Sequence, residues 1–293
     1  MSRVKAYTAT AIGVFAVWWA APLVRLAAAP PPIAAWWRFT IGGAAITLIA
    51  AARRSRLPLE PRAVAAGLLL YLHMLLWFYS LEGATILAST ALVTTYPVFI
   101  AAVEAFRGEV PRWKAALVAA PLIAAAIYTS TGISPTAAFE ALLSSLSVSG
   151  YFLVLRAARL RGFDADGLAA VTYASAAAIS TLHLTLLHIN PLDVSPHSVP
   201  YLVALGLIPM ALGHTLLNYA LAYLPATIVT GAVLTEPLGA SLLAALLLGE
   251  TPPAAQVSLS LSLLASTAAA LYPQTSRSRR ARSSSRAAQH TSR

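Results

Sequence analysis

Among the ionisable side chains within the long apolar segments of this 293-residue chain, four are candidates for chemistry: Arg38, His73, His214 and Glu236. A charged group in hydrocarbon costs at least about 2.5–3.5 kcal/mol on insertion scales, so each is expected to face a protein interior or cavity. Glu236 could take up a proton or hold the ammonium group of a substrate. It could equally be a protonated carboxyl group that donates to the backbone at a helix bend, and the sequence leaves both roles open.

Each of the two histidines has a candidate partner four residues further along the chain. Trp77 follows His73, and Asn218 follows His214, so each pair shares one face of a helix. A neutral imidazole both donates and accepts hydrogen bonds and titrates near physiological pH, and an indole offers an aromatic plane. These residues are therefore candidates for the wall of a substrate cavity. The alternative is a histidine that only bonds a neighbouring helix.

Arg38 could bind a substrate carboxylate, but a structural pairing with a carbonyl group or with Glu140 is the favoured expectation. Trp18 belongs to a set of tryptophans near one membrane interface, where aromatic belts form. It is also a candidate for the outer mouth of a cavity.

A repeat places two prolines in equivalent positions. Residues 90–97, Thr-Ala-Leu-Val-Thr-Thr-Tyr-Pro, recur as Thr-Gly-Ala-Val-Leu-Thr-Glu-Pro at 230–237. A proline within a helix removes one backbone donor, so Pro97 and Pro237 leave the carbonyls of Val93 and Val233 without their helical partners. Broken helices near the bilayer midplane are where transporters with internal repeats bind substrates. Both prolines are thus candidates for helix breaks that take part in gating.

Composition makes lipid the expected solvent. Hydrophobic residues make up 58% and charged residues 10% of the chain, whereas soluble domains carry about 25% charged residues. The absence of cysteine excludes disulfides and thiolate chemistry. We expect no metal site, no cofactor and no enzymatic activity, because no Walker lysine, H-E-x-x-H or G-x-S-x-G motif occurs. An intramembrane enzyme is the least favoured alternative.

The apolar segments predict an all-α polytopic membrane protein with ten transmembrane helices, because each crossing needs about 20 apolar residues. With the N-terminus inside, 18 of the 20 Lys and Arg residues fall on the cytoplasmic side. This bias predicts that both termini are cytoplasmic. The first apolar run is longer than a signal-peptide core and is expected to be retained as a span. The predicted spans are 6–24, 33–51, 63–82, 85–105, 113–131, 137–157, 167–188, 199–221, 226–248 and 254–272.

Five spans per repeat is an odd number, so the second repeat must be inverted relative to the first. The predicted units are a first five-helix repeat at 1–132, a second at 133–273, and a disordered basic tail at 274–293. We expect the tail to contact anionic lipid headgroups, since each basic residue near such a surface contributes about 1 kcal/mol. Nucleic acid is not expected as a partner, and the oligomeric state is left open.

Several motifs together resemble a tandem pair of EamA domains of the drug/metabolite transporter superfamily. The resemblance covers about residues 6 to 272, and its motifs are Trp18-Trp19 with Arg25, Trp37-Arg38-Phe39, Phe78-Tyr79-Ser80-Leu81, Gly108-Glu109, Asn218-Tyr219-Ala220-Leu221, Thr235-Glu236-Pro237 and Leu248-Gly249-Glu250-Thr251. Tyr96 departs from the family pattern, in which many members carry Glu before the proline.

The resemblance implies a secondary transporter of the cytoplasmic (plasma) membrane, and specifically an exporter of amino acids or similar amphipathic or aromatic solutes. It also implies that Tyr96 and Tyr151 belong to helices that line the cavity. Proton coupling and facilitated flow both fit. The rival within the superfamily is a sugar-phosphate or nucleotide-sugar carrier, which would need several basic residues in the cavity, whereas Arg38 is the one central candidate.

Overall fold

The computed structural model describes residues 3–59, 61–108, 113, 119–224 and 226–271. Helices form nearly all the secondary structure of this described part, because a backbone surrounded by lipid must satisfy its own hydrogen bonds. The predicted basic tail at 274–293, and Glu109 of the Gly-Glu motif, lie outside the described residues. In the first half the helices are α1 Arg3–Trp18, α2 Ala20–Ala27, α3 Pro31–Ala52, α4 Pro61–Glu82, α5 Ile86–Val93, α6 Tyr96–Phe106 and α8 Ala119–Ser130.

The second half consists of α9 Pro135–Leu160, α10 Ala165–Leu186, α11 Ser198–Leu205, the π-helix η1 Gly206–His214, α12 Thr215–Ala220, α13 Ala226–Val233, α14 Glu236–Leu248 and α15 Ala254–Leu271. By length and composition, eight helices of the described part could cross a membrane, and two shorter apolar helices accompany them. All ten predicted spans contain helix, so the all-α polytopic fold is confirmed. The count of ten crossings stays a prediction.

Local signals explain several helix starts. Proline occupies the first position of α3, α4 and α9, where its missing N–H costs nothing. The Thr85 side chain accepts a hydrogen bond from the Ala88 N–H at the start of α5, and Ser134 caps α9 in the same way. Large side chains such as Leu48 (71% exposed) and Leu246 (74% exposed) cover the outside of the bundle. This surface is suited to lipid.

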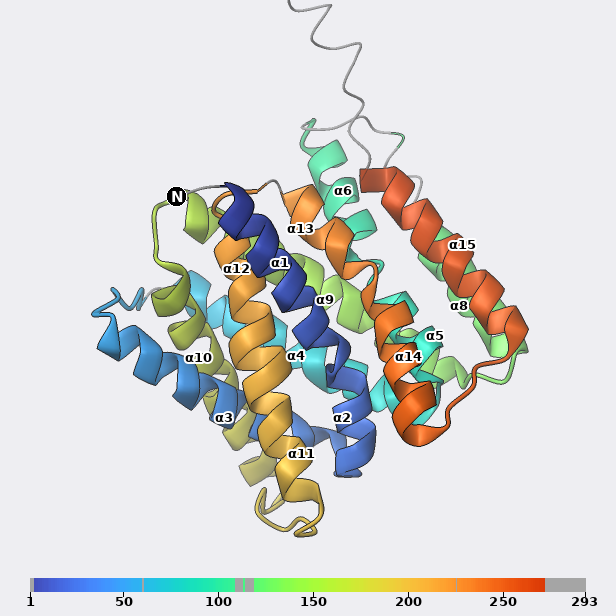
Figure 1. Ribbon diagram of the computed structural model, residues 1–293, viewed down its shortest axis with the longest axis horizontal. Coiled ribbons are helices and arrows are strands. Elements are labelled where there is room, and N and C mark those ends of the chain that lie inside the picture. Colours follow the sequence, from blue (N-terminus) through green and yellow to red (C-terminus); the bar gives the residue numbers. More distant parts are fainter. Residues whose placement is uncertain (1–2, 60, 109–112, 114–118, 225, 272–293) are drawn as a thin grey trace, which may run out of the picture.

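The two halves interleave. Helix α9 packs along α4, and α10 packs along both α3 and α4, so helices from both halves share one core. Helix α1 packs on η1, α12 and α14, while α15 lies beside α5, α6 and α8 (Figure 1). The predicted repeats, with boundaries at 132/133 and 273, are therefore units of the sequence, and their helices do not form two separate bundles.

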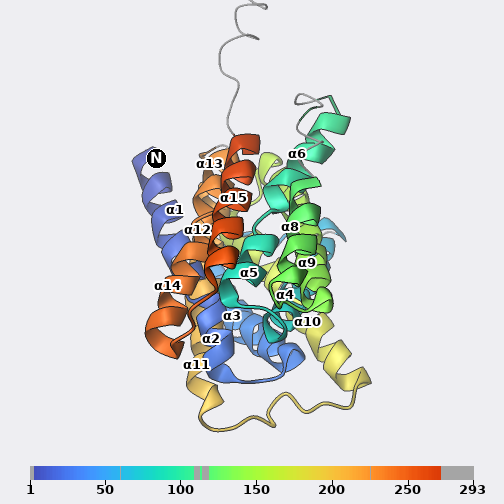
Figure 2. The ribbon, with the colours of Figure 1, turned by 90° about the vertical axis from the view of Figure 1, so that its right-hand side faces the viewer.

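The two proline-containing segments run in opposite directions. Helices α5 and α6 lead toward the end of the bundle that holds residue 3 and the end of α15, whereas α13 and α14 lead away from it (Figures 1 and 2). Inverted repeats require this arrangement. Both ends of the described chain lie on one side, as an even number of crossings demands, and the assignment of that side to the cytoplasm stays a prediction.

Candidate functional site

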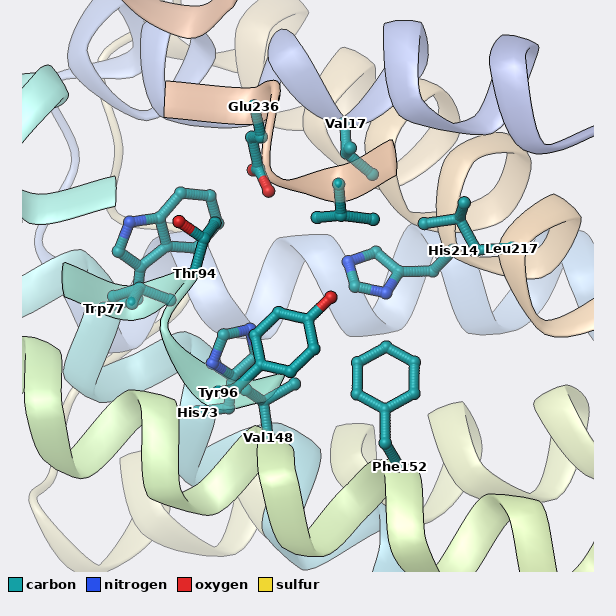
Figure 3. A pocket seen from close by; sticks show the side chains of 12 residues that line it. Val17, His73, Trp77, Thr94, Tyr96, Val148, Phe152, His214, Leu217 and Glu236 are labelled. Atoms are coloured by element: carbon teal, nitrogen blue, oxygen red, sulfur yellow. The ribbon is translucent and has the colours of Figure 1, made fainter. Parts of the chain in front are cut away.

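A central cavity lies where the two broken helices meet (Figure 3). Its free volume is about 30 Å³, far below the roughly 300–1,000 Å³ of small-molecule sites, so the cavity is nearly closed in this conformation. Side chains from α1, α4, α5, α6, α9, η1, α12, α13 and α14, and from the α5–α6 turn, surround it. They are Val17, His73, Trp77, Val93, Thr94, Tyr96, Val148, Phe152, His214, Leu217, Val233 and Glu236.

Each of the two predicted proline-containing spans is broken into two helices. Helix α5 ends at Val93 and α13 ends at Val233, and a new helix begins one residue before each proline, at Tyr96 and at Glu236. Within the described residues, neither the Val93 nor the Val233 carbonyl accepts another backbone hydrogen bond. Both valines line the cavity.

Glu236 occupies the first turn of α14, where the helix dipole favours a negative charge. The side chain is 8% exposed and points into the cavity (Figure 3). Its carboxyl group makes no hydrogen bond to the described residues. The alternative role, in which a protonated Glu236 donates to the backbone at the helix break, is therefore not supported by a hydrogen bond. The carboxyl group can therefore meet a proton or a cationic group from the cavity.

His73 is held by two helices. Its ring stacks on Trp77 with centroids 6.1 Å apart and planes at 11°, while its Nδ1 lies 2.8 Å from the Ser144 hydroxyl. That hydroxyl donates its proton to the His73 carbonyl oxygen at 2.8 Å, so it can only accept from the ring. Nδ1 must then carry the proton, which leaves Nε2 as an acceptor for another group.

An aromatic wall and the second histidine complete the cavity. Tyr96 stacks on Phe152 with ring centroids 5.1 Å apart, and His214 ends the π-helix η1 on the opposite side. Pro209 lies inside η1, and π-helices often occur at functional sites. The Tyr96 hydroxyl is buried and has no hydrogen-bond partner within the described residues.

Three predicted cavity residues lie outside the lining. Tyr151 and Asn218 are buried and bond each other, with the Asn218 amide donating to the Tyr151 hydroxyl at 3.1 Å. Trp18 packs against Gly239, where an added Cβ would lie 2.0 Å from the indole. Its neighbour Val17 contacts the cavity instead. The roles of all three stay predictions.

Arg38 is fully buried, and none of its three guanidinium nitrogens has a hydrogen-bond partner within the described residues. Its guanidinium carbon lies 5.8 Å from the centroid of the Phe78 ring. It interacts electrostatically with Glu236. The structure shows neither the carbonyl pairing nor the Glu140 pairing that was favoured for this residue.

Sequence reasoning missed most of the cavity's apolar wall and the partner of His73. Ser144, Val148 and Phe152 are spaced four residues apart on α9, so they present one face. That spacing could have indicated a shared helix face. It does not show that this face lines a cavity, because nearly every helix in this chain is apolar on all sides.

Comparison with known proteins agrees with the fold. Residues 136–272 match the model of the EamA-like transporter family. Eight chains of solved structures match, and one crystal structure superposes with a TM-score of 0.68 at 19% identity, covering 92% of this chain and 98% of its own. At that identity the likeness shows the fold alone. No curated protein matches the sequence.

The fold and the matched domain define a multi-pass membrane transporter. Its second half, at residues 136–272, matches the EamA-like transporter family, which supports the expected relation to the drug/metabolite transporter superfamily.

Proposed function

We propose that this protein exports amino acids, or similar amphipathic or aromatic solutes, across the plasma membrane by alternating access. One observation carries the proposal: two oppositely directed broken helices meet at a cavity that holds Glu236, His73 and His214 beside aromatic side chains. Aromatic and aliphatic groups suit an apolar solute side chain, and the ionisable groups suit its polar end.

The composition of the cavity supports amino acids over phosphorylated sugars. Neither Lys nor Arg is among the twelve lining residues, whereas a doubly charged phosphate is normally held by several basic groups. Glu236 in the lining would repel such a group.

Uptake into proteoliposomes tests this function. Purified protein should take up radiolabelled phenylalanine several-fold above empty vesicles, and an imposed pH gradient should stimulate uptake if Glu236 carries the coupling proton. The variant Glu236→Gln keeps the shape of the side chain but cannot ionise. It should lose the stimulation while retaining uptake without a gradient.

Equal stimulation of the wild type and Glu236→Gln would remove the proton-carrying role from this residue. Stronger competition by sugar phosphates than by amino acids would replace the proposed substrate class with the rival one. Glu250→Gln is an unsuitable control, because Glu250 accepts a 2.6 Å hydrogen bond from the Ile86 N–H. Asp193, on an exposed loop, provides the matched control Asp193→Asn.

A further inference from the structure

Buried donors without acceptors gather beside the cavity. They are the three nitrogens of Arg38, the Trp77 indole N–H and the Tyr96 hydroxyl, and none has a hydrogen-bond partner within the described residues. Trp77 and Tyr96 line the cavity directly. A buried polar group left unpaired loses the hydrogen bonds it makes in water, so such groups normally have partners. A cluster of such donors is suited to bind a group that brings acceptors.

The cavity also holds the complementary chemistry. Glu236 offers carboxyl oxygens, and Nε2 of His73 offers a lone pair, because Nδ1 is committed to Ser144. Acceptors and unsatisfied donors therefore lie close together around this cavity, since His73 stacks on Trp77. A solute with both an ammonium and a carboxylate group can satisfy both kinds of group.

We propose that Arg38 binds the carboxylate of the transported solute and makes the carrier selective for zwitterionic α-amino acids. This inference rests on the proposed function and specifies its substrate class. Arg38 is suited to the role because its planar guanidinium can donate two parallel hydrogen bonds to one carboxylate. It is a specificity-determining residue, with Glu236 receiving the ammonium group.

In the present conformation Arg38 is packed behind the cavity wall. Its guanidinium rests near the Phe78 ring, and Phe78 contacts Trp77 with ring centroids 5.6 Å apart. A cation near a benzene ring is held less strongly than one bound by a carboxylate. Substrate entry should therefore draw the flexible arginine side chain from Phe78 toward the cavity.

The experiment compares phenylalanine with phenethylamine, which lacks the carboxylate, and with 3-phenylpropionate, which lacks the ammonium group. Competition is measured in proteoliposomes, and binding to solubilised protein is followed by tryptophan fluorescence. The wild type should prefer phenylalanine to phenethylamine by about tenfold or more, as expected for a lost charged hydrogen-bond pair. In Arg38→Met this preference should fall to about twofold, while discrimination against 3-phenylpropionate remains.

Two variants serve as controls. Arg53→Met removes an arginine that pairs with Asp166 at 2.7 Å on the surface, and it should keep the wild-type preference. Arg38→Met should fold, because it removes a buried cation that has no hydrogen bonds to lose, and Glu236, which loses the nearby positive charge, can take up a proton. Thermal unfolding of the purified variant checks this. Arg38→Lys keeps the positive charge but cannot donate two parallel hydrogen bonds, so its preference for phenylalanine over phenethylamine should be intermediate.

An unchanged preference in folded Arg38→Met would overturn the proposal, as would a wild type that binds phenethylamine as tightly as phenylalanine. Tighter binding of sugar phosphates than of phenylalanine would assign the donors to phosphate and overturn it too. Selective binding of phenylalanine without any uptake would leave the Arg38 assignment standing and remove the transport proposal. The two failures are thus distinguishable.

Discussion

At the residue scale, His73 and Ser144 illustrate how a polar pair between helices fixes chemistry. The pair exchanges two hydrogen bonds between α4 and α9, and each is 2.8 Å long. The first fixes the proton on Nδ1, and the second ties the serine to the backbone. Whenever the His73 ring is neutral, its Nε2 atom is therefore the nitrogen that can accept a hydrogen bond.

Ser144→Ala should lower the free energy of unfolding by about 1 kcal/mol, the usual net value of a buried hydrogen bond. It should also weaken solute binding, because Nδ1 of His73 then keeps only its longer 3.2 Å hydrogen bond to the backbone carbonyl of residue 144, and the ring is held less firmly. Thermal unfolding and phenylalanine uptake measure the two effects. Ser147→Ala is the matched control, since Ser147 bonds only to the Leu143 carbonyl in its own helix. Equal stability and equal uptake of the two variants would contradict the role assigned to the Ser144 hydroxyl in holding the His73 ring.

The polar residues within apolar helices are the part of the site that could be predicted from the sequence. His73, His214 and Glu236 stand out in sequence because their burial in lipid would be costly, and all three line the cavity. Asn218 stood out for the same reason but is satisfied by Tyr151. Val17 and Val148 could not be recognised, because an apolar residue in an apolar helix carries no distinguishing signal.

At the scale of elements, the prolines turn two helices into four. Helices α5 and α6 are separated at Thr94 and Thr95, and the Thr95 hydroxyl donates to the Leu92 carbonyl at 2.6 Å. Thr235 bonds the Ala232 carbonyl in the same way at 2.8 Å. Threonine hydroxyls thus satisfy neighbouring carbonyls at both breaks, which makes each break a stable element.

Pro97→Ala and Pro237→Ala should each restore the donor that the preceding valine carbonyl lacks. The continuous helix should leave thermal stability unchanged or higher, and transport should fall about tenfold because the break no longer opens to the cavity. Uptake and thermal unfolding of both variants test this. Pro196→Ala, in an exposed loop, is the control. Full transport by both variants would show that the breaks are not needed for gating.

The helix break could be predicted from sequence, whereas the π-helix could not. Proline removes a defined donor, so its effect is local. In η1, by contrast, Gly206 and Gly213 let α3 and α1 approach closely: an added Cβ on Gly42 would lie 2.9 Å from the Gly206 carbonyl oxygen. This contact depends on helices far apart in sequence. Span boundaries agree to within a few residues, since lipid thickness sets the length.

At the scale of the molecule, the topology makes a direct prediction. The chain has no cysteine, so a single introduced thiol reports its own position. Leu192→Cys, in the loop between α10 and α11, should react with a membrane-impermeant maleimide in intact cells. Leu57→Cys, between α3 and α4, should react only after lysis. Both leucines are exposed, at 65% and 49%, and labelling of Leu57→Cys in intact cells would contradict the cytoplasmic assignment.

The interleaving of the two halves has a consequence for biosynthesis. Helix α4 is complete at Glu82, yet α9, against which it packs, begins only at Pro135. A nascent chain must therefore hold α3 and α4 in the bilayer with their inner faces uncovered until the later helices leave the ribosome. Chains truncated before α9 and α10 should accordingly be substrates for membrane quality-control proteases.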